Sequence, residues 1–372
     1  MRLLFVSNGH GEDSMAAAII AQLPPGLAAD AYPTLGSGAA YQSICPIVGP
    51  RAFLPSEGWR NTAGSVLRDL QGGVLSTFGP AVRFMRNIRH AYPKTVVVGD
   101  LVGLVLCWHS GVKVAVYVDA FRNGYAHSYS PPERWLIKAA AQTVFCRDDL
   151  LARELRSGGI DARAAGNIMM DTIPYAAYDP APRRTGALAL AILPGSRATA
   201  VDHFATQIAA LRLLPKEKLP DLFVAVAPGV DPVALAEAGG LNWANRAGGE
   251  VADLGRLEGD GLIIHLAAGA LGNLIEASDA VLSQAGTATW QAIGLGRPVI
   301  SFIMPADRLK RLRDEAAFTG ESRVLCPRDP IAIAAALTLL LADPEERARR
   351  GRVGRARMGG PGAIQAILKE LA

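Results

Sequence analysis

Short apolar runs rich in β-branched residues alternate with stretches of helical length, and this alternation limits the fold more than any other feature. Near-continuous apolar strands separated by helices are typical of parallel sheets that are covered on both faces. We therefore predict an α/β chain built from two doubly wound, Rossmann-like domains. The expected strands are 3–7, 95–99, 112–118, 143–146, 188–193, 222–226, 261–265, 280–282 and 298–302, and the clearest helical stretches are 15–23, 132–141, 201–214 and 286–295.

The length of 372 residues suits two domains of ordinary size. Pro, Arg and Gly cluster without periodicity in YAAYDPAPRRTG, residues 175–186, and a new strand starts directly afterwards. We therefore predict an N-terminal domain over 1–178 and a C-terminal domain over 179–345, facing a cleft. The basic segment 346–372 is expected to be a helical tail that packs back on the first domain.

Composition excludes several classes of protein. The chain is 50% hydrophobic and 19% charged, so it can bury a full core, and its net charge of +4 does not indicate a nucleic-acid partner. Four widely spaced cysteines without a C-x-x-C motif predict neither a disulfide framework nor a metal site. The longest apolar tracts are shorter than the roughly 20 residues of a membrane span, and no signal peptide is apparent. We expect a cytoplasmic protein, with contact to the membrane surface left open.

The segment SNGHGEDS, residues 7–14, follows the first expected strand and precedes a helix. Gly9 and Gly11 give it the form of a phosphate-binding loop, but Glu12 and Asp13 would repel a phosphate. Helix capping explains acidic residues in a first turn, and a dinucleotide site would need a third glycine where serine stands. Crowding of His10, Glu12 and Asp13 at a strand end instead predicts binding of a hydroxyl-rich ligand, or of an alcohol that needs a base.

The segment ILPGSR, residues 192–197, also follows an apolar strand and precedes a helix. Gly195 lets the backbone approach a ligand, Ser196 can donate a hydrogen bond, and Arg197 offers a forked cation that matches phosphate. A tight turn that carries a surface arginine is the alternative interpretation.

The segment SQAGTATWQ, residues 283–291, places small and hydroxyl residues between a strand and a helix. Ser283 ends the strand, and Gly286, Thr287 and Ala288 lead into the helix, where backbone N–H groups are free to bind an anion. Together with the Pro-Gly-Ser-Arg loop, this segment predicts a clamp for a pyrophosphate.

These motifs, in this order, resemble those of the GT-B glycosyltransferases, and above all of the lipid-A-disaccharide synthase family. That family carries L-L-P-G-S-R at the start of its second domain and S-G-T-A-T-L-E later, similar to the segments at 192–197 and 283–291. The resemblance implies a UDP-sugar donor held by the second domain, a lipid or glycolipid acceptor and no cofactor. It also implies that Gln291, where the family has Glu, contacts the ribose hydroxyls.

The first domain departs from the family. Its opening loop differs from the family's G-E-A-S-G-D, and the acidic V-G-x-D segment is matched only loosely, at 98–101. Asp100 ends an apolar strand and is our first candidate for the base that takes the acceptor's proton, with a helix cap as its alternative role. His10 is the rival base, and Asp13 is a further catalytic candidate.

We therefore predict an inverting, metal-independent transfer of a sugar from a UDP-sugar to a lipid or glycolipid hydroxyl. An epimerase of the UDP-N-acetylglucosamine 2-epimerase type and a non-catalytic nucleotide-sugar-binding relative are the alternatives, with a dinucleotide dehydrogenase behind them. The segment 78–94 interleaves apolar and basic residues, which fits either a helix on anionic lipid or a surface helix with a buried apolar face. Oligomerisation is left open.

Overall fold

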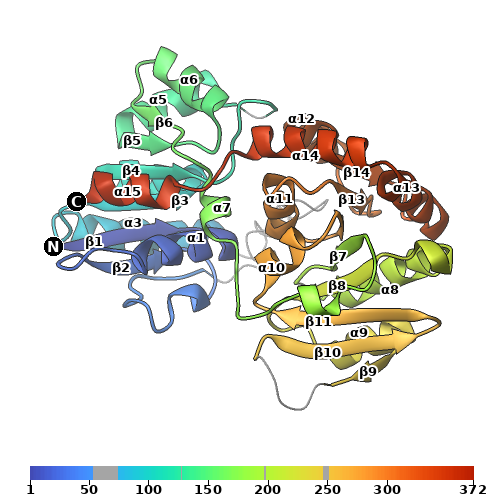
Figure 1. Cartoon of the computed structure of the whole chain (residues 1–372). Coiled ribbons are helices and arrows are strands. Elements are labelled where there is room, and N and C mark those ends of the chain that lie inside the picture. Colours follow the sequence, from blue (N-terminus) through green and yellow to red (C-terminus); the bar gives the residue numbers. More distant parts are fainter. Residues whose placement is uncertain (53–73, 127, 197, 246–250) are drawn as a thin grey trace. The chain divides into compact units, whose positions relative to one another are not determined.

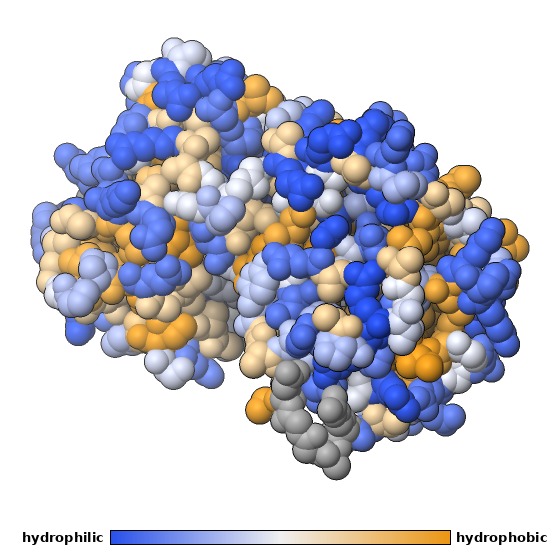
Figure 2. Space-filling model, viewed as in Figure 1, coloured by the Kyte–Doolittle hydropathy of each residue, from blue (hydrophilic) through white to orange (hydrophobic). Residues whose placement is uncertain are grey.

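The computed structural model describes residues 1–52, 74–126, 128–196, 198–245 and 251–372 (Figure 1). The chain divides into two compact units. The first contains residues 1–172, 306–318 and 359–372, and the second contains residues 173–305 and 319–358. Each unit has its own sheet, and Figure 1 shows helices around both sheets. Hydrophilic residues cover much of the face seen in Figure 2, with hydrophobic residues scattered among them.

The first unit is built on a six-stranded parallel sheet with the order β2-β1-β3-β4-β5-β6. Its strands are β1 (Arg2–Ser7), β2 (Ala28–Pro33), β3 (Thr95–Gly99), β4 (Val114–Asp119), β5 (Ala141–Phe145) and β6 (Ala162–Arg163). Its helices are α1 (His10–Ile20), η1 (Ala39–Tyr41), α3 (Val74–Ile88), α4 (Leu101–His109), α5 (Pro131–Ala140), α6 (Asp149–Ser157), α7 (Ile168–Asp171), α12 (Leu309–Thr319) and α15 (Ala363–Leu371). Val6 and Val97 belong to a buried cluster that also includes residues of α3, α4 and α5.

The second unit is built on an eight-stranded sheet with the order β14-β13-β12-β7-β8-β11-β10-β9. Its strands are β7 (Ala189–Leu193), β8 (Asp221–Val226), β9 (Asn242–Ala244), β10 (Asp253–Gly259), β11 (Leu262–Ala268), β12 (Ala280–Ser283), β13 (Val299–Phe302) and β14 (Arg323–Cys326). Its helices are η2 (Ala181–Arg183), α8 (Ala200–Leu211), η3 (Lys216–Lys218), α9 (Pro232–Gly239), α10 (Leu271–Glu276), α11 (Thr287–Gly294), η4 (Gly320–Ser322), α13 (Pro330–Ala342) and α14 (Pro344–Met358).

This architecture confirms the predicted pair of doubly wound α/β sheets. The strands from β14 to β11 are parallel, and only β10 and β9 add an antiparallel edge that the sequence analysis did not predict. The first helix begins at His10 and not near residue 15, so the expected loop is partly the first turn of α1. At the C-terminus, Pro344–Met358 belongs to the second unit, and only residues 359–372 belong to the first.

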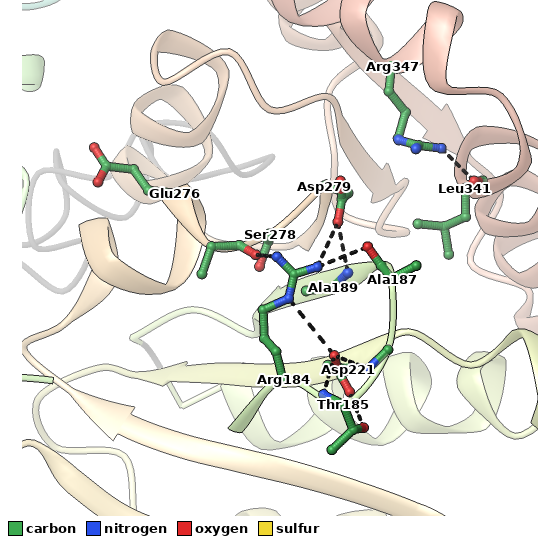
Figure 3. A network of polar contacts seen from close by, with 12 residues as sticks. Arg184, Thr185, Ala187, Ala189, Asp221, Glu276, Ser278, Asp279, Leu341 and Arg347 are labelled. Atoms are coloured by element: carbon green, nitrogen blue, oxygen red, sulfur yellow. Dashed lines mark hydrogen bonds and ion pairs between the residues drawn. The ribbon is translucent and has the colours of Figure 1, made fainter. Parts of the chain in front are cut away.

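The segment that enters the second unit is tied to the starts of its strands. Arg184 lies 3.9 Å from the Asp221 carboxylate at the start of β8 and 3.7 Å from the Asp279 carboxylate just before β12 (Figure 3). Asp221 also accepts hydrogen bonds from the backbone and hydroxyl of Thr185. These contacts fix the segment around Arg184 at the N-terminal ends of β8 and β12.

Candidate functional site

Both sheets have a topological switch point, and the predicted motifs fall on the two points. In the first sheet the chain moves from β1 to β2 in one direction and from β3 to β4 in the other, so β1 and β3 flank the switch. In the second sheet the switch lies between β7 and β12. Ligands of open α/β sheets bind outside the carboxyl ends of the strands at such points.

At the first switch point, two loops approach each other closely. An added Cβ on Gly99 would lie 2.5 Å from Asn8 Oδ1 and 2.9 Å from Glu12 Cγ. One on Gly9 would lie 2.5 Å from Glu12 Oε2, so the Glu12 side chain folds back over this loop. Gly99 also has φ of +134°, a conformation that favours glycine. These glycines therefore let the loops after β1 and β3 form one site.

Asp100 is held at this site by two hydrogen bonds. Its Oδ1 accepts the Val102 N–H at 2.8 Å, as the N-cap of α4, and the Asn8 amide Nδ2 at 2.6 Å. Asp100 is therefore a helix cap, but among the described residues both of these bonds are accepted by one oxygen. The second oxygen of this half-buried carboxylate can accept a proton from a ligand.

The other acidic residues of the opening loop have different surroundings. Burial raises the pKa of Glu12, and the neighbouring Asp100 charge raises it further. Asp13 is 2% exposed, and its Oδ1 accepts the Ser7 hydroxyl at 2.5 Å, which lies 2.6 Å from the Tyr41 hydroxyl. Burial raises the pKa of Asp13 to about 6. Asp13 thus lies in the interior behind the site, whereas Glu12 and Asp100 are two neighbouring, half-buried carboxyl groups at the site itself.

His10 is exposed in the first turn of α1, near the same pair. Its ring Cε1 lies 3.7 Å from where an added Cβ on Gly36 would stand, in the segment that follows β2. Gly11 is also exposed at this end of the helix. The structure therefore brings His10, Glu12 and Asp100 together, and it adds Asn8, which the sequence analysis missed because an isolated asparagine after a strand carries no motif.

At the second switch point, the loops after β7 and β12 are adjacent. The Gln284 N–H donates to Leu193 O at 2.8 Å, and an added Cβ on Gly195 would lie 3.6 Å from Gln284 O. Gly195 has φ of +112°. The Gln284 side chain is bonded in both directions to the backbone of Phe302, at 2.9 Å each. Thus the Pro-Gly-Ser loop and the Gln-Ala-Gly loop form one rigid surface.

Only part of the predicted clamp faces outward. Ser196, Gly286 and Thr287 are exposed and Ala288 is half-buried, and an added Cβ on Gly286 would meet no atom within 4 Å. This leaves room for a ligand at the start of α11, where backbone N–H groups lack helical partners. Arg197 lies outside the described residues.

The remaining predicted residues of the clamp lie inside the second unit. The Ser283 hydroxyl lies 2.6 Å from the Thr289 hydroxyl and accepts the Ala285 N–H at 3.2 Å. Ser283 is fully buried, and Gln291 is only 3% exposed. The side chain of His203, which the sequence analysis missed, supports the loop from below, because its Nδ1 lies 2.9 Å from Pro194 O.

A cavity of about 770 Å³ lies at the other end of the strands from these two loops. Its lining includes Arg183, Asp221, Asp253, Arg256 and His265, at or near the starts of β8 and β11. Because open sheets bind their ligands at the carboxyl ends of strands, the two loops, and not this cavity, are the candidate ligand site of the second unit. In the part of the chain that the structure describes, no cluster of three or more His, Cys, Asp or Glu could hold a metal ion.

A search of protein-family models found no match. Among curated proteins, the chain is similar to lipid-A-disaccharide synthase of Xanthomonas campestris pv. campestris (strain 8004), with 30% identity over 172 residues. The matched region is 44% of this chain but only 36% of that enzyme, so the chain spans about a third of the length of this relative.

Solved structures match along nearly the whole chain. MurG of Acinetobacter baumannii has a TM-score of 0.60 at 13% identity and covers 99% of this chain and 98% of its own. UDP-GlcNAc 2-epimerase from Neisseria meningitidis, bound to UDP-GlcNAc, has a TM-score of 0.56 at 14% identity, with 100% and 99% covered. These likenesses show that the chain has the GT-B fold. Over the 172 residues above, its sequence is similar to lipid-A-disaccharide synthase.

Proposed function

We propose that this protein transfers a sugar from a UDP-sugar to a hydroxyl of a lipid or glycolipid, with inversion and without a metal ion. The observation that carries the proposal is the pairing of the Pro-Gly-Ser loop with the start of α11 at the switch point of the second sheet. A glycine-lined loop and a free helix N-terminus together suit a pyrophosphate. The partial similarity to lipid-A-disaccharide synthase supports a nucleotide-sugar donor.

In this proposal, the pyrophosphate is stabilised by backbone N–H groups and hydroxyls. Gly195 and Gly286 leave the backbone open to the ligand, and Ser196 and Thr287 supply hydroxyl donors. Fixed donors aimed at the leaving group stabilise charge as it develops, which is the work a metal ion does in other transferases. Arg197 would add a forked cation.

The acceptor hydroxyl would be deprotonated at the switch point of the first sheet. Asp100 takes the proton, the acceptor oxygen attacks the anomeric carbon of the sugar, and the bond between that carbon and UDP breaks in the same step. One displacement inverts the configuration and releases UDP. Glu12 stands beside this base, and its pKa is raised by burial and by the Asp100 charge.

In this proposal, a lipid acceptor contacts a surface formed by α3, α4 and α5. Val82 and Met85 of α3 are buried, so this helix uses its apolar side for the core, as the second sequence interpretation expected. The exposed apolar groups come mainly from α4 and α5. Trp108 is 45% exposed and Trp135 60% exposed, and their rings pack edge to face with centroids 5.5 Å apart.

This aromatic surface, defined by Phe78, Val105, Trp108 and Trp135, has cations beside it. Arg86 donates to the backbone carbonyl of His109, whose ring lies 6.0 Å from that of Phe78. Exposed tryptophans next to basic residues are typical of proteins that bind the interface of anionic lipid. None of the described helices is long and apolar enough to cross a membrane. We propose that the aromatic surface holds the protein at the cytoplasmic membrane face as a peripheral protein.

The test combines two assays. Incubation with labelled UDP-sugars and a lipid extract should release UDP and label a lipid, and omission of the extract should abolish both. UDP release without any acceptor would favour the epimerase reaction. That reaction is the alternative because the fold is also similar to that of UDP-GlcNAc 2-epimerases. In the second assay, a Trp108→Ser/Trp135→Ser variant should sediment with phosphatidylglycerol vesicles much less than the wild type. Leu339→Ser, which removes an apolar side chain that is 75% exposed on α13, is the matched control.

A further inference from the structure

Two buried tyrosine hydroxyls connect the end of β4 to the peptide that carries Asp100. Asp119 lies opposite Gly99 in the β3–β4 register and is 1% exposed. Its Oδ2 accepts the Tyr129 hydroxyl at 2.7 Å, and the Tyr129 oxygen lies 3.0 Å from the Tyr117 hydroxyl. Tyr117 in turn donates to Gly99 O at 3.2 Å. The chain of hydroxyls therefore ends on the carbonyl of the peptide that joins Gly99 to Asp100.

That peptide determines where the Asp100 carboxylate points. Gly99 is in a backbone conformation that few residues adopt, and its Cα is packed against Asn8. Its carbonyl accepts hydrogen bonds from the Tyr117 hydroxyl and from the Ala120 N–H, the latter at 3.3 Å. The Asn8 amide donates a hydrogen bond to the Asp100 carboxylate at 2.6 Å. A rotation of the peptide between Gly99 and Asp100 would break this bond, because it would move the Asp100 carboxylate.

We propose that Tyr117 and Tyr129 are positioning residues that hold the Asp100 carboxylate in place for proton transfer. The inference rests on the proposed function, because that function assigns the proton to Asp100. Neither tyrosine is accessible to a ligand, since both side chains are buried and their hydroxyls contact each other.

The protonation state of Asp119 decides how strongly Tyr117 can hydrogen-bond to the Gly99 carbonyl, because the chain of hydroxyls contains a limited number of protons. Each tyrosine has one hydroxyl proton, and Asp119 Oδ1 is already occupied by the N–H groups of Phe121 and Arg122. When Asp119 is ionised, Tyr129 donates to it, and the single Tyr117 proton is divided between Gly99 O and the Tyr129 oxygen. When Asp119 is neutral, it donates to Tyr129, Tyr129 donates to Tyr117, and Gly99 O receives a full hydrogen bond.

The groups that face Asp119 allow this change near neutral pH. Burial raises the pKa of Asp119 to about 6, against the opposing influence of the Arg147 charge and of its own hydrogen bonds. Burial also raises the pKa values of both tyrosines and of the Cys146 thiol far above that range. The Arg122 guanidinium lies 5.2 Å from the centre of the Tyr129 ring. Asp119 is therefore the group of this set that changes charge near pH 6.

The experiment compares Tyr117→Phe with Tyr92→Phe. Tyr92 donates to the buried Asp30 at 2.7 Å, so the control breaks a tyrosine–aspartate bond that has no link to Gly99. In Tyr117→Phe we expect kcat to fall about five- to tenfold, the effect of one net hydrogen bond, with KM for the UDP-sugar unchanged. Hydrogen exchange at the amides of Val102 and Ala120, which donate to Asp100 and to Gly99 O, should speed up by a similar factor.

The wild type should also lose protection at these two amides, relative to the intrinsic exchange rate, as pH rises through about 6. The inference is overturned if exchange at both amides is the same in Tyr117→Phe and the wild type, or if Tyr92→Phe changes it equally. Exchange needs no substrate, so this result is independent of the proposed function. Failure of the proposed function would be seen separately, as an absence of sugar transfer by the wild type.

Discussion

The substitution Gly99→Ala tests the geometry of the first switch point most directly. Alanine would have to adopt φ of +134°, which costs about 1–3 kcal/mol. Its Cβ would also lie 2.5 Å from Asn8 Oδ1 and 2.9 Å from Glu12 Cγ, so side chains must move. Overpacking of this kind costs typically about 1–3 kcal/mol. We therefore expect a loss of about 2–6 kcal/mol in the free energy of unfolding.

The effect on activity follows from the same clash. Displacement of Asn8 breaks its hydrogen bond to Asp100, so kcat should fall about 10- to 100-fold, whereas UDP affinity should not change. Urea denaturation and initial rates of transfer measure the two effects. Gly26→Ala is the matched control, since its φ is +92° and an added Cβ would meet nothing within 4 Å. A Gly99→Ala variant no less stable and no less active than Gly26→Ala would refute the close approach of the two loops.

Three further variants test individual roles. Asp100→Asn keeps a good helix cap but loses the base, so the rate should fall about 10²- to 10⁴-fold with stability nearly unchanged; full activity would exclude Asp100. Arg197→Ala should weaken UDP binding roughly 10- to 100-fold in calorimetry, and unchanged affinity would remove Arg197 from the clamp. The pKa of Asp13 is raised by burial to about 6, so its contribution to stability is complete below about pH 4 and is lost as pH rises through 6. In Asp13→Asn, the denaturation midpoint should fall less between pH 4 and 6 than in the wild type, because Asp119, whose pKa burial also raises to about 6, keeps its own contribution. An unaltered profile would contradict the role of Asp13.

The fold could be predicted because parallel strands buried on both faces leave a clear trace in sequence. Thr95–Gly99 is buried at every position and has three valines in a row, and its bounds match the predicted strand. The antiparallel strands β9 and β10 were missed for the opposite reason. Asp253–Gly259 is an antiparallel strand with charged and glycine residues, and only two of its positions are buried. Such a strand is defined by its neighbours and not by its own hydrophobicity.

The candidate site could be predicted only where a motif follows a strand. The segments after β1, β7 and β12 were found this way, and strand order then places them at the two switch points. Spacing in the sequence does not show which side of a short loop faces solvent. Asp13 and Ser283 therefore looked equivalent to Glu12 and Thr287, although the structure buries the first pair.

The buried support of the site carried no sequence signal, and this has a physical reason. Tyr117 lies in an apolar strand, and Tyr129 lies in a loop that ends in an ordinary helix cap. A tyrosine in either place is normally a core residue with a satisfied hydroxyl. Its role here depends on contact with Gly99 O, which is created only when β3 and β4 pair in a specific register. Residues that act on a proposed base through the backbone can therefore be recognised only in the structure. The Tyr117→Phe substitution tests whether the hydrogen bond to the Gly99 carbonyl affects the rate of sugar transfer.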